Sequence, residues 1–124
     1  QMADRVIFTD EVTGEPLRAI VKNADGLVLP STYEGFGLPP LEAMAARVPV
    51  LCSWALTMPE VCGPSALYCD PYSVESIAEG LQKLIGLKGP EREQRLKDGY
   101  EHAAQFNWDK TAAQTLEVFR NALW

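Results

Sequence analysis

The chain has 124 residues, of which 47% are hydrophobic and 23% are charged. This length and composition suit one globular domain with a real but modest core. The 17 acidic residues outnumber the 11 basic ones, which gives a net charge of −6. A surface of that sign disfavours nucleic acid and anionic membranes as partners.

No apolar run reaches the length of a transmembrane segment, and the first residues lack the pattern of a signal peptide. The three cysteines, Cys52, Cys62 and Cys69, form no C-x-x-C pair and have no histidine nearby. We expect them to be reduced, buried side chains of a cytoplasmic protein, and we expect no metal site.

Short apolar runs alternate along the chain with longer segments of helical periodicity. Strands are expected at residues 6–8, 27–29, 48–52 and 66–69. Helices are expected at residues 16–23, 38–46, 74–85, 91–104 and 108–123, with a helical turn at 58–61. The strands are uninterrupted apolar runs, which indicates a parallel sheet with helices on both faces. The predicted fold is α/β, a partial Rossmann-like domain with a four-stranded parallel sheet and a helical C-terminal extension.

The segment of residues 30–45 follows an expected buried strand and opens a helix. Ligands of open parallel sheets bind at the carboxyl ends of the strands, so this loop is expected at the ligand edge. Gly35 and Gly37 bracket Phe36 and allow the backbone to approach a ligand closely. The helix start that follows offers unpaired N–H groups and the positive end of the helix dipole, which suit a phosphate.

Two glutamates flank this turn, Glu34 before the glycines and Glu42 about one helical turn after them. A carboxylate can accept two hydrogen bonds and so can hold a vicinal diol. The arrangement therefore indicates a ligand with hydroxyls at both ends and phosphate between them, which is the form of a nucleotide-sugar. A plain structural loop stays open as an alternative, because Gly-x-Gly alone is weak and a glutamate near a helix start often only complements the dipole.

The whole string of residues 34–45, EGFGLPPLEAMA, resembles the E-x7-E signature of retaining family-4 glycosyltransferases. Further segments that resemble this family are residues 23–31, 48–53, 58–63, 70–71 and 106–108. The resemblance implies the GT-B architecture, in which two Rossmann-like domains face a cleft. It also implies transfer of a hexose from an activated donor to an acceptor with retention of configuration.

The resemblance implies a role for each residue of the signature. Glu34 would be the catalytic-site residue that contacts the donor sugar near the reacting centre. Gly35, Phe36, Gly37 and Leu38 would offer backbone to the sugar and diphosphate, and Glu42 would bind the ribose hydroxyls. The donor is a nucleotide-diphosphate sugar, and neither a metal nor a further cofactor is implied.

Two departures from the family pattern matter. Arg47 stands where the family often has a glycine after the helix, which must strain or alter the helix end. The family's C-terminal domain also starts with two further strands, which carry an arginine and a lysine, and it faces an acceptor-binding N-terminal domain. We therefore expect residues 1–124 to be a single truncated donor-binding domain that lacks transferase activity by itself and needs the missing domain or a partner chain.

In the family's strand order the two missing strands lie between the expected strands at residues 6–8 and 27–29. Their removal would leave residues 6–8 either to pair directly with residues 27–29 or to pair with another chain. An exposed strand edge invites pairing between molecules, so a homodimer is expected. The alternative to an enzyme part is a non-catalytic α/β module that binds a nucleotide-sugar or self-associates. A third possibility is a structural domain whose signature residues bind nothing.

Overall fold

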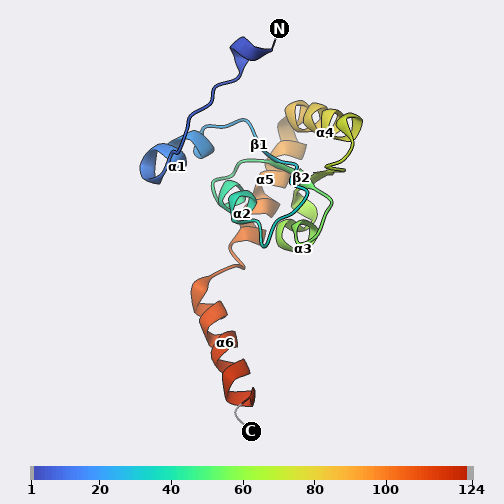
Figure 1. Cartoon of the computed structure of the whole chain (residues 1–124). Helices are drawn as coiled ribbons and strands as arrows, with labels where there is room; N and C mark the ends of the chain where they lie inside the picture. Colours follow the sequence, from blue (N-terminus) through green and yellow to red (C-terminus); the bar gives the residue numbers. More distant parts are fainter. Residues whose placement is uncertain (1, 123–124) are drawn as a thin grey trace.

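The computed structural model describes residues 2–122 of the chain (Figure 1). In chain order the elements are the 3-10 turn η1 (Ala3–Arg5), α1 (Gly14–Lys22), β1 (Leu27–Leu29), α2 (Leu38–Ala45), β2 (Val50–Ser53), α3 (Met58–Cys62), the 3-10 turn η2 (Gly63–Ser65), β3 (Leu67–Cys69), α4 (Val74–Gly86), α5 (Gly89–Ala103) and α6 (Trp108–Ala122). The expected helices are thus present, with bounds that differ by no more than two residues from those expected, and the expected end of the last helix at residue 123 lies outside the described residues.

The sheet is parallel, as predicted, and its strands lie in the order β1-β2-β3. Leu27 of β1 pairs with Val50, and Leu51 of β2 pairs with Leu67. All four residues of the central strand β2 are buried, because helices cover it from both sides. This explains why its sequence is an unbroken apolar run rather than an alternating one.

The prediction of a fourth strand at residues 6–8 is wrong, because the sheet formed by residues 2–122 has three strands, β1, β2 and β3. Val6, Ile7 and Phe8 form an extended segment that is 52%, 86% and 90% exposed, respectively. An apolar run forms a strand only where a neighbouring strand satisfies its backbone groups, and no described strand lies beside this segment. Figure 1 shows the segment running away from the body of the molecule.

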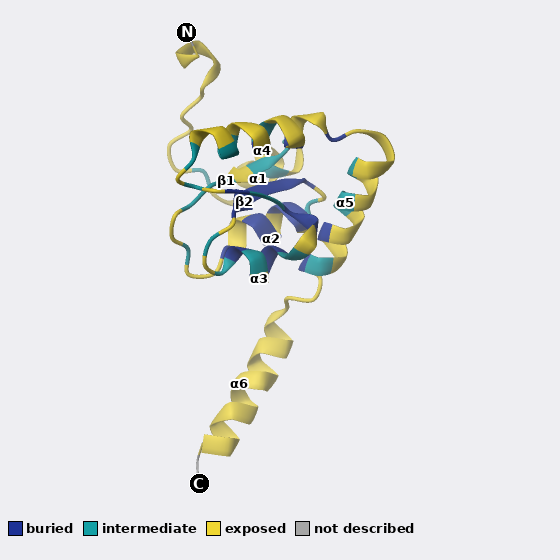
Figure 2. Ribbon diagram, turned by 90° about the vertical axis from the view of Figure 1, so that its right-hand side faces the viewer, coloured by how far each residue is buried: buried dark blue, intermediate teal, exposed yellow. Residues whose placement is uncertain are grey.

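Helices cover both faces of the sheet, as predicted (Figure 2). Helix α4 packs on β2 and β3 from one side, whereas α2 packs on β1 and β2 from the other. Gly80 allows the close approach of α4, since a β-carbon there would lie 2.7 Å from Leu51 Cδ1. Helix α5 then packs along α2 and completes the layer on that side.

The core has two parts, one on each side of β2. The larger part comprises buried residues on the α2 side, namely Leu41, Ala43, Met44, Val48, Val50, Cys52, Met58, Val61, Cys62, Ala66 and Ala103. The smaller part lies under α4 and comprises Leu51, Cys69, Leu84 and Leu87. The three cysteines are free, and all are buried, which confirms the prediction of their burial.

Helix α6 forms the expected helical C-terminal extension and projects from the body (Figures 1 and 2). All of its residues are exposed, including Leu116, Val118 and Phe119. None of the helices within residues 2–122 combines the length and apolarity that crossing a membrane requires.

Candidate functional site

The loop of residues 30–37 joins β1 to α2 and lies at the carboxyl end of β1. Pro30 ends the strand, and Gly37 is the N-cap of α2 with a φ of 105° and a ψ of 49°. Residues with side chains rarely adopt that conformation, so the sharp entry into α2 requires glycine. Gly37 thus makes a glycine-dependent turn at the carboxyl edge of the sheet, where ligands of parallel sheets bind.

The two glutamates occupy different settings on either side of Gly37. Glu34 lies in the loop, is half-buried, and its Oε1 accepts a hydrogen bond from the Ser31 hydroxyl at 2.9 Å. Glu42 lies one turn into α2 and is exposed. The Ser31 hydroxyl therefore fixes the Glu34 carboxylate, whereas Glu42 stays free to accept donors from a ligand.

The backbone donors of the turn are fewer than the sequence pattern indicated. Helix α2 begins at Leu38, so Pro39 and Pro40 take the next two positions and have no N–H to offer. The first turn therefore presents the Leu38 amide, which has no intrahelical acceptor. The amides of Gly35, Phe36 and Gly37 add further donors, for which residues 2–122 provide no acceptor.

Thr57, which the sequence did not single out, forms hydrogen bonds to the backbone of this loop. The Thr57 hydroxyl lies 3.2 Å from the Glu34 carbonyl oxygen and 3.3 Å from that of Phe36. Thr57 is the N-cap of α3, but its side chain makes no capping hydrogen bond to that helix. A threonine before a proline-containing turn indicates a helix cap. The local sequence therefore predicted a role for Thr57 in α3 and gave no sign of its contact with the loop.

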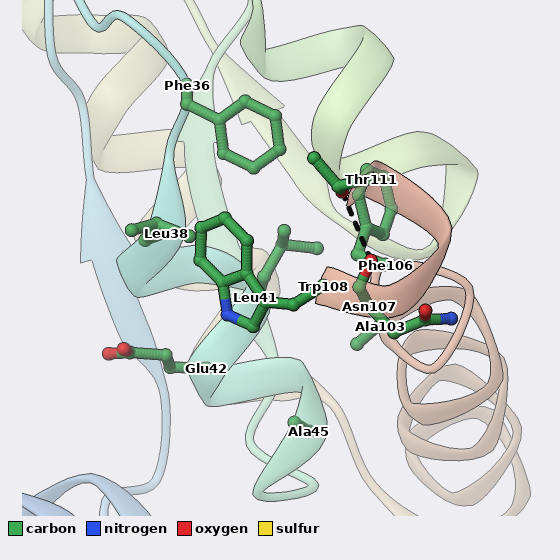
Figure 3. A pocket seen from close by; sticks show the side chains of 10 residues that line it. All are labelled: Phe36, Leu38, Leu41, Glu42, Ala45, Ala103, Phe106, Asn107, Trp108 and Thr111. Atoms are coloured by element: carbon green, nitrogen blue, oxygen red, sulfur yellow. Dashed lines mark hydrogen bonds between the residues drawn. The ribbon is translucent and has the colours of Figure 1, made fainter. Parts of the chain in front are cut away.

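A hollow of about 500 Å³ lies between α2 and the corner that joins α5 to α6 (Figure 3). Its lining is largely apolar and comprises Phe36, Leu38, Leu41, Glu42, Ala45, Ala103, Phe106, Asn107, Trp108 and Thr111. Phe36 of the loop makes an edge-to-face contact with Phe106, with ring centroids 6.0 Å apart. In Figure 3 the Glu42 carboxylate points away from these rings. The hollow thus adjoins the loop and carries one carboxylate at its margin.

His102 supports this corner and plays no visible part in the loop. Its Nε2 lies 2.8 Å from the carbonyl oxygen of Val61, and its ring lies 5.4 Å from that of Phe106. A β-carbon on Gly63 would lie 2.8 Å from the imidazole Cε1. The imidazole therefore joins α5 to the end of α3 as a packing residue.

The titratable groups with shifted pKa lie in the core behind the loop. Burial raises the pKa of Tyr68, whose hydroxyl donates to the Gly63 carbonyl oxygen. The interaction with Cys62 and burial hold the pKa of the Cys52 thiol well above its ordinary value. Both side chains therefore stay protonated near neutral pH and are not activated nucleophiles. Within residues 2–122, no three metal-ligating side chains gather at one place.

A glycine-flexed turn between a parallel strand and a helix, at the carboxyl edge of a sheet covered on both faces, defines the Rossmann-like class of α/β ligand-binding proteins. Residues 1–102 match the model of the family described as "Glycosyl transferases group 1". The chain belongs to this family of glycosyltransferases, and it shares their Rossmann-like GT-B fold.

Several characterised proteins are similar to this chain. The "O-antigen chain mannosyltransferase B" of Escherichia coli is 41% identical over 88% of this chain and 28% of its own length. The "MMP alpha-(1->4)-mannosyltransferase" of Mycolicibacterium hassiacum is 36% identical over 98% of this chain and 30% of its own length. The solved structure of a sucrose-phosphate synthase from Thermosynechococcus elongatus superposes with a TM-score of 0.82 at 31% identity, over 97% of this chain and 31% of that one. The chain spans less than a third of the length of these relatives.

Proposed function

We propose that this chain is the donor-binding part of a retaining glycosyltransferase, which transfers a hexose from a nucleotide-diphosphate sugar to an acceptor. One observation carries the proposal: the loop at the end of β1, between Glu34 and Glu42, presents backbone donors for which residues 2–122 provide no acceptor. Such donors at a helix start bind phosphate in an acidic protein without a cluster of basic side chains.

Each residue of the loop has a role in this proposal. The amides of Gly35, Phe36, Gly37 and Leu38 bind the diphosphate and the neighbouring sugar oxygens. The exposed Glu42 accepts hydrogen bonds from the ribose hydroxyls. Glu34, whose carboxylate Ser31 orients, lies beside the donor sugar and is the catalytic-site residue. Because two relatives are named as mannosyltransferases, mannose is the first hexose to test.

The transfer reaction needs more than this loop provides. Cations that neutralise a leaving diphosphate contribute a large electrostatic term, and a facing domain positions the acceptor and excludes water. The relatives contain more than two thirds of their length outside the matched span. We therefore expect the 124 residues alone to show no transfer of radiolabelled sugar, and turnover by this chain alone would refute that expectation. We place the donor site in the cytoplasm, where thiols such as its three cysteines stay reduced.

An alternative function is a non-catalytic α/β module that binds a nucleotide-sugar or self-associates. The exposed apolar segment of residues 6–8 favours self-association, because Ile7 and Phe8 are 86% and 90% exposed. A module that only self-associates would bind no nucleotide, so one titration separates the readings.

That titration measures the heat of binding of GDP, UDP, ADP and their sugars to the 124-residue chain. We expect saturable binding of one nucleoside diphosphate, and about tenfold weaker binding for Glu42→Ala, which corresponds to about 1.4 kcal/mol. The control is Glu79→Ala, which removes an exposed carboxylate from α4 on the other face of the sheet. Equal affinities for Glu42→Ala and the unaltered chain would remove Glu42 from the ribose site.

A further inference from the structure

The Thr57 side chain makes its hydrogen bonds to the candidate donor loop instead of to its own helix. Thr57 is the N-cap of α3, and a threonine at an N-cap ordinarily accepts from the amide two or three residues on. No such bond is present here, and Pro59 at the second position has no N–H to donate. The hydroxyl oxygen therefore accepts from no amide of α3, and the hydroxyl proton donates to the loop.

Two carbonyl groups of the loop converge on this hydroxyl. The carbonyl oxygens of Glu34 and Phe36 lie 3.2 Å and 3.3 Å from Thr57 Oγ1. In a trans peptide the N–H points opposite to the C=O of the same unit. The structure has no cis peptide bond among its described residues. The N–H groups of Gly35 and Gly37 belong to these two peptide units, so both point away from Thr57.

The backbone around Thr57 is shaped to hold it beneath the loop. Leu56 has a φ of 50°, a left-handed conformation that a leucine rarely adopts. Met58, the next residue after Thr57, packs against Gly37, where a β-carbon would lie 2.8 Å from Met58 Cε. The start of α3 therefore contacts the loop at two points, one polar and one apolar.

We propose that Thr57 is a positioning residue that holds the peptide units 34–35 and 36–37 side by side, with the amides of Gly35 and Gly37 turned toward the diphosphate of the donor. This inference rests on the proposed function only for the position of the ligand. The orientation of the two peptide units follows from the contacts of Thr57 alone. Thr57 acts through the loop backbone and does not itself touch the donor.

The test compares three substitutions at this position. Thr57→Val removes the hydroxyl and keeps the branched shape, Thr57→Ser keeps the hydroxyl, and Thr57→Ala removes it with less bulk. We expect Thr57→Val and Thr57→Ala to bind the preferred nucleoside diphosphate about tenfold more weakly, and Thr57→Ser to restore affinity to within about twofold. If the valine variant does not fold, the alanine and serine variants still give the comparison.

The matched control is Thr115→Val on α6, which removes a hydroxyl that bonds to the Thr111 carbonyl oxygen at 2.8 Å, away from the loop. Unchanged affinity in Thr57→Val and Thr57→Ala would overturn the proposal while leaving the donor site intact. Equal weakening by Thr57→Ser would also overturn it, because the loss would then come from packing.

A second readout needs no ligand. The temperature coefficients of the Gly35 and Gly37 amide protons, measured by NMR in the unliganded chain, report how these two peptide units are held. We expect both temperature coefficients to change in Thr57→Ala and to have the values of the unaltered chain in Thr57→Ser. If the unaltered chain binds none of GDP, UDP or ADP, the proposed function fails, and this readout alone decides for or against the positioning role of Thr57.

Discussion

Gly37 lies directly against Met58, so that a β-carbon built on the glycine would come within 2.8 Å of the methionine Cε. This contact joins the N-cap of α2 to the first residue of α3 and fixes the candidate donor loop on the core. The same glycine has a φ of 105°, which a residue with a side chain adopts only under strain.

We therefore expect Gly37→Ala to destabilise the chain by about 1–3 kcal/mol, from backbone strain and overpacking against Met58. Urea unfolding measures this change. Gly35→Ala is the matched control, because a β-carbon at Gly35 meets nothing within 4 Å. If both alanines leave stability unchanged, the turn is not held as the structure has it.

The end of α2 gives a second prediction. Arg47 has a φ of 59°, and it follows the last turn of α2 in the position where helices often have glycine. The amides of Arg47 and Val48 bond back to Met44 and Ala43, which is the Schellman arrangement. Arg47 thus occupies the usual glycine position with a strained backbone. Its guanidinium carbon lies 4.5 Å from the centroid of the Tyr100 ring.

Both Arg47→Gly and Arg47→Ala lose the cation–π contact, so comparing them isolates the backbone strain. We expect Arg47→Gly to be the more stable of the two by about 0.5–1 kcal/mol. Glycine relieves the backbone strain, and this gain exceeds the loss that comes from a more flexible unfolded chain. Thermal unfolding of both variants checks this. Equal or greater stability of the alanine variant would contradict a left-handed conformation at residue 47.

Tyr68 gives a prediction that depends on pH. Burial raises its pKa in the folded chain, whereas the unfolded value is about 10. The stabilisation by the Tyr68 hydroxyl is therefore complete below about pH 10 and is lost as the pH rises above that value. We expect Tyr68→Phe to lower stability by about 1 kcal/mol at neutral pH, because the Gly63 carbonyl loses its donor.

The difference between the two proteins should shrink above about pH 10, where the unfolded tyrosine ionises. Urea unfolding of both proteins at neutral and alkaline pH provides the measurement. The centroid of the Trp54 ring lies 4.7 Å from that of Tyr68, and we expect this edge-to-face contact to be kept by phenylalanine, which has the same ring without the hydroxyl. If the difference in unfolding free energy stays constant with pH, burial does not raise the pKa of the Tyr68 hydroxyl.

Self-association remains a prediction, although the structure changes its basis. The segment of residues 6–8 is not a strand, but it is apolar and exposed, and β1 is an edge strand of the sheet. We expect a dimer at high concentration in sedimentation equilibrium, weakened severalfold by Ile7→Ser. Val74→Ser removes a similar exposed aliphatic residue at the start of α4 and should have no effect. A monomer at all concentrations would rule the dimer out.

Local patterns in the sequence predicted most of the fold. The strands expected at residues 27–29 and 66–69, observed at 27–29 and 67–69, and the helix that opens after Gly37 were all visible as apolar runs and glycine–proline punctuation. The strand expected at residues 6–8 failed because strand formation depends on a neighbouring strand, which no local pattern reveals.

The candidate site was predictable only along the chain. The order Glu34, Gly35, Gly37 and Glu42 gave the turn and its flanking acids. The contact of Thr57 with the carbonyls of residues 34 and 36 spans more than 20 residues of sequence and arises from how α3 packs under the loop. The hollow beside Phe36 likewise depends on the packing of α5 against α2.

The central claim is that the amides of residues 35–38 hold the diphosphate of a sugar donor. An NMR titration of the isotope-labelled chain with GDP, UDP and ADP tests it most directly. The account predicts that the largest chemical-shift changes fall on the amides of Gly35, Phe36, Gly37 and Leu38. Changes confined to α4 or α6, or no change at saturating nucleotide concentration, would contradict it.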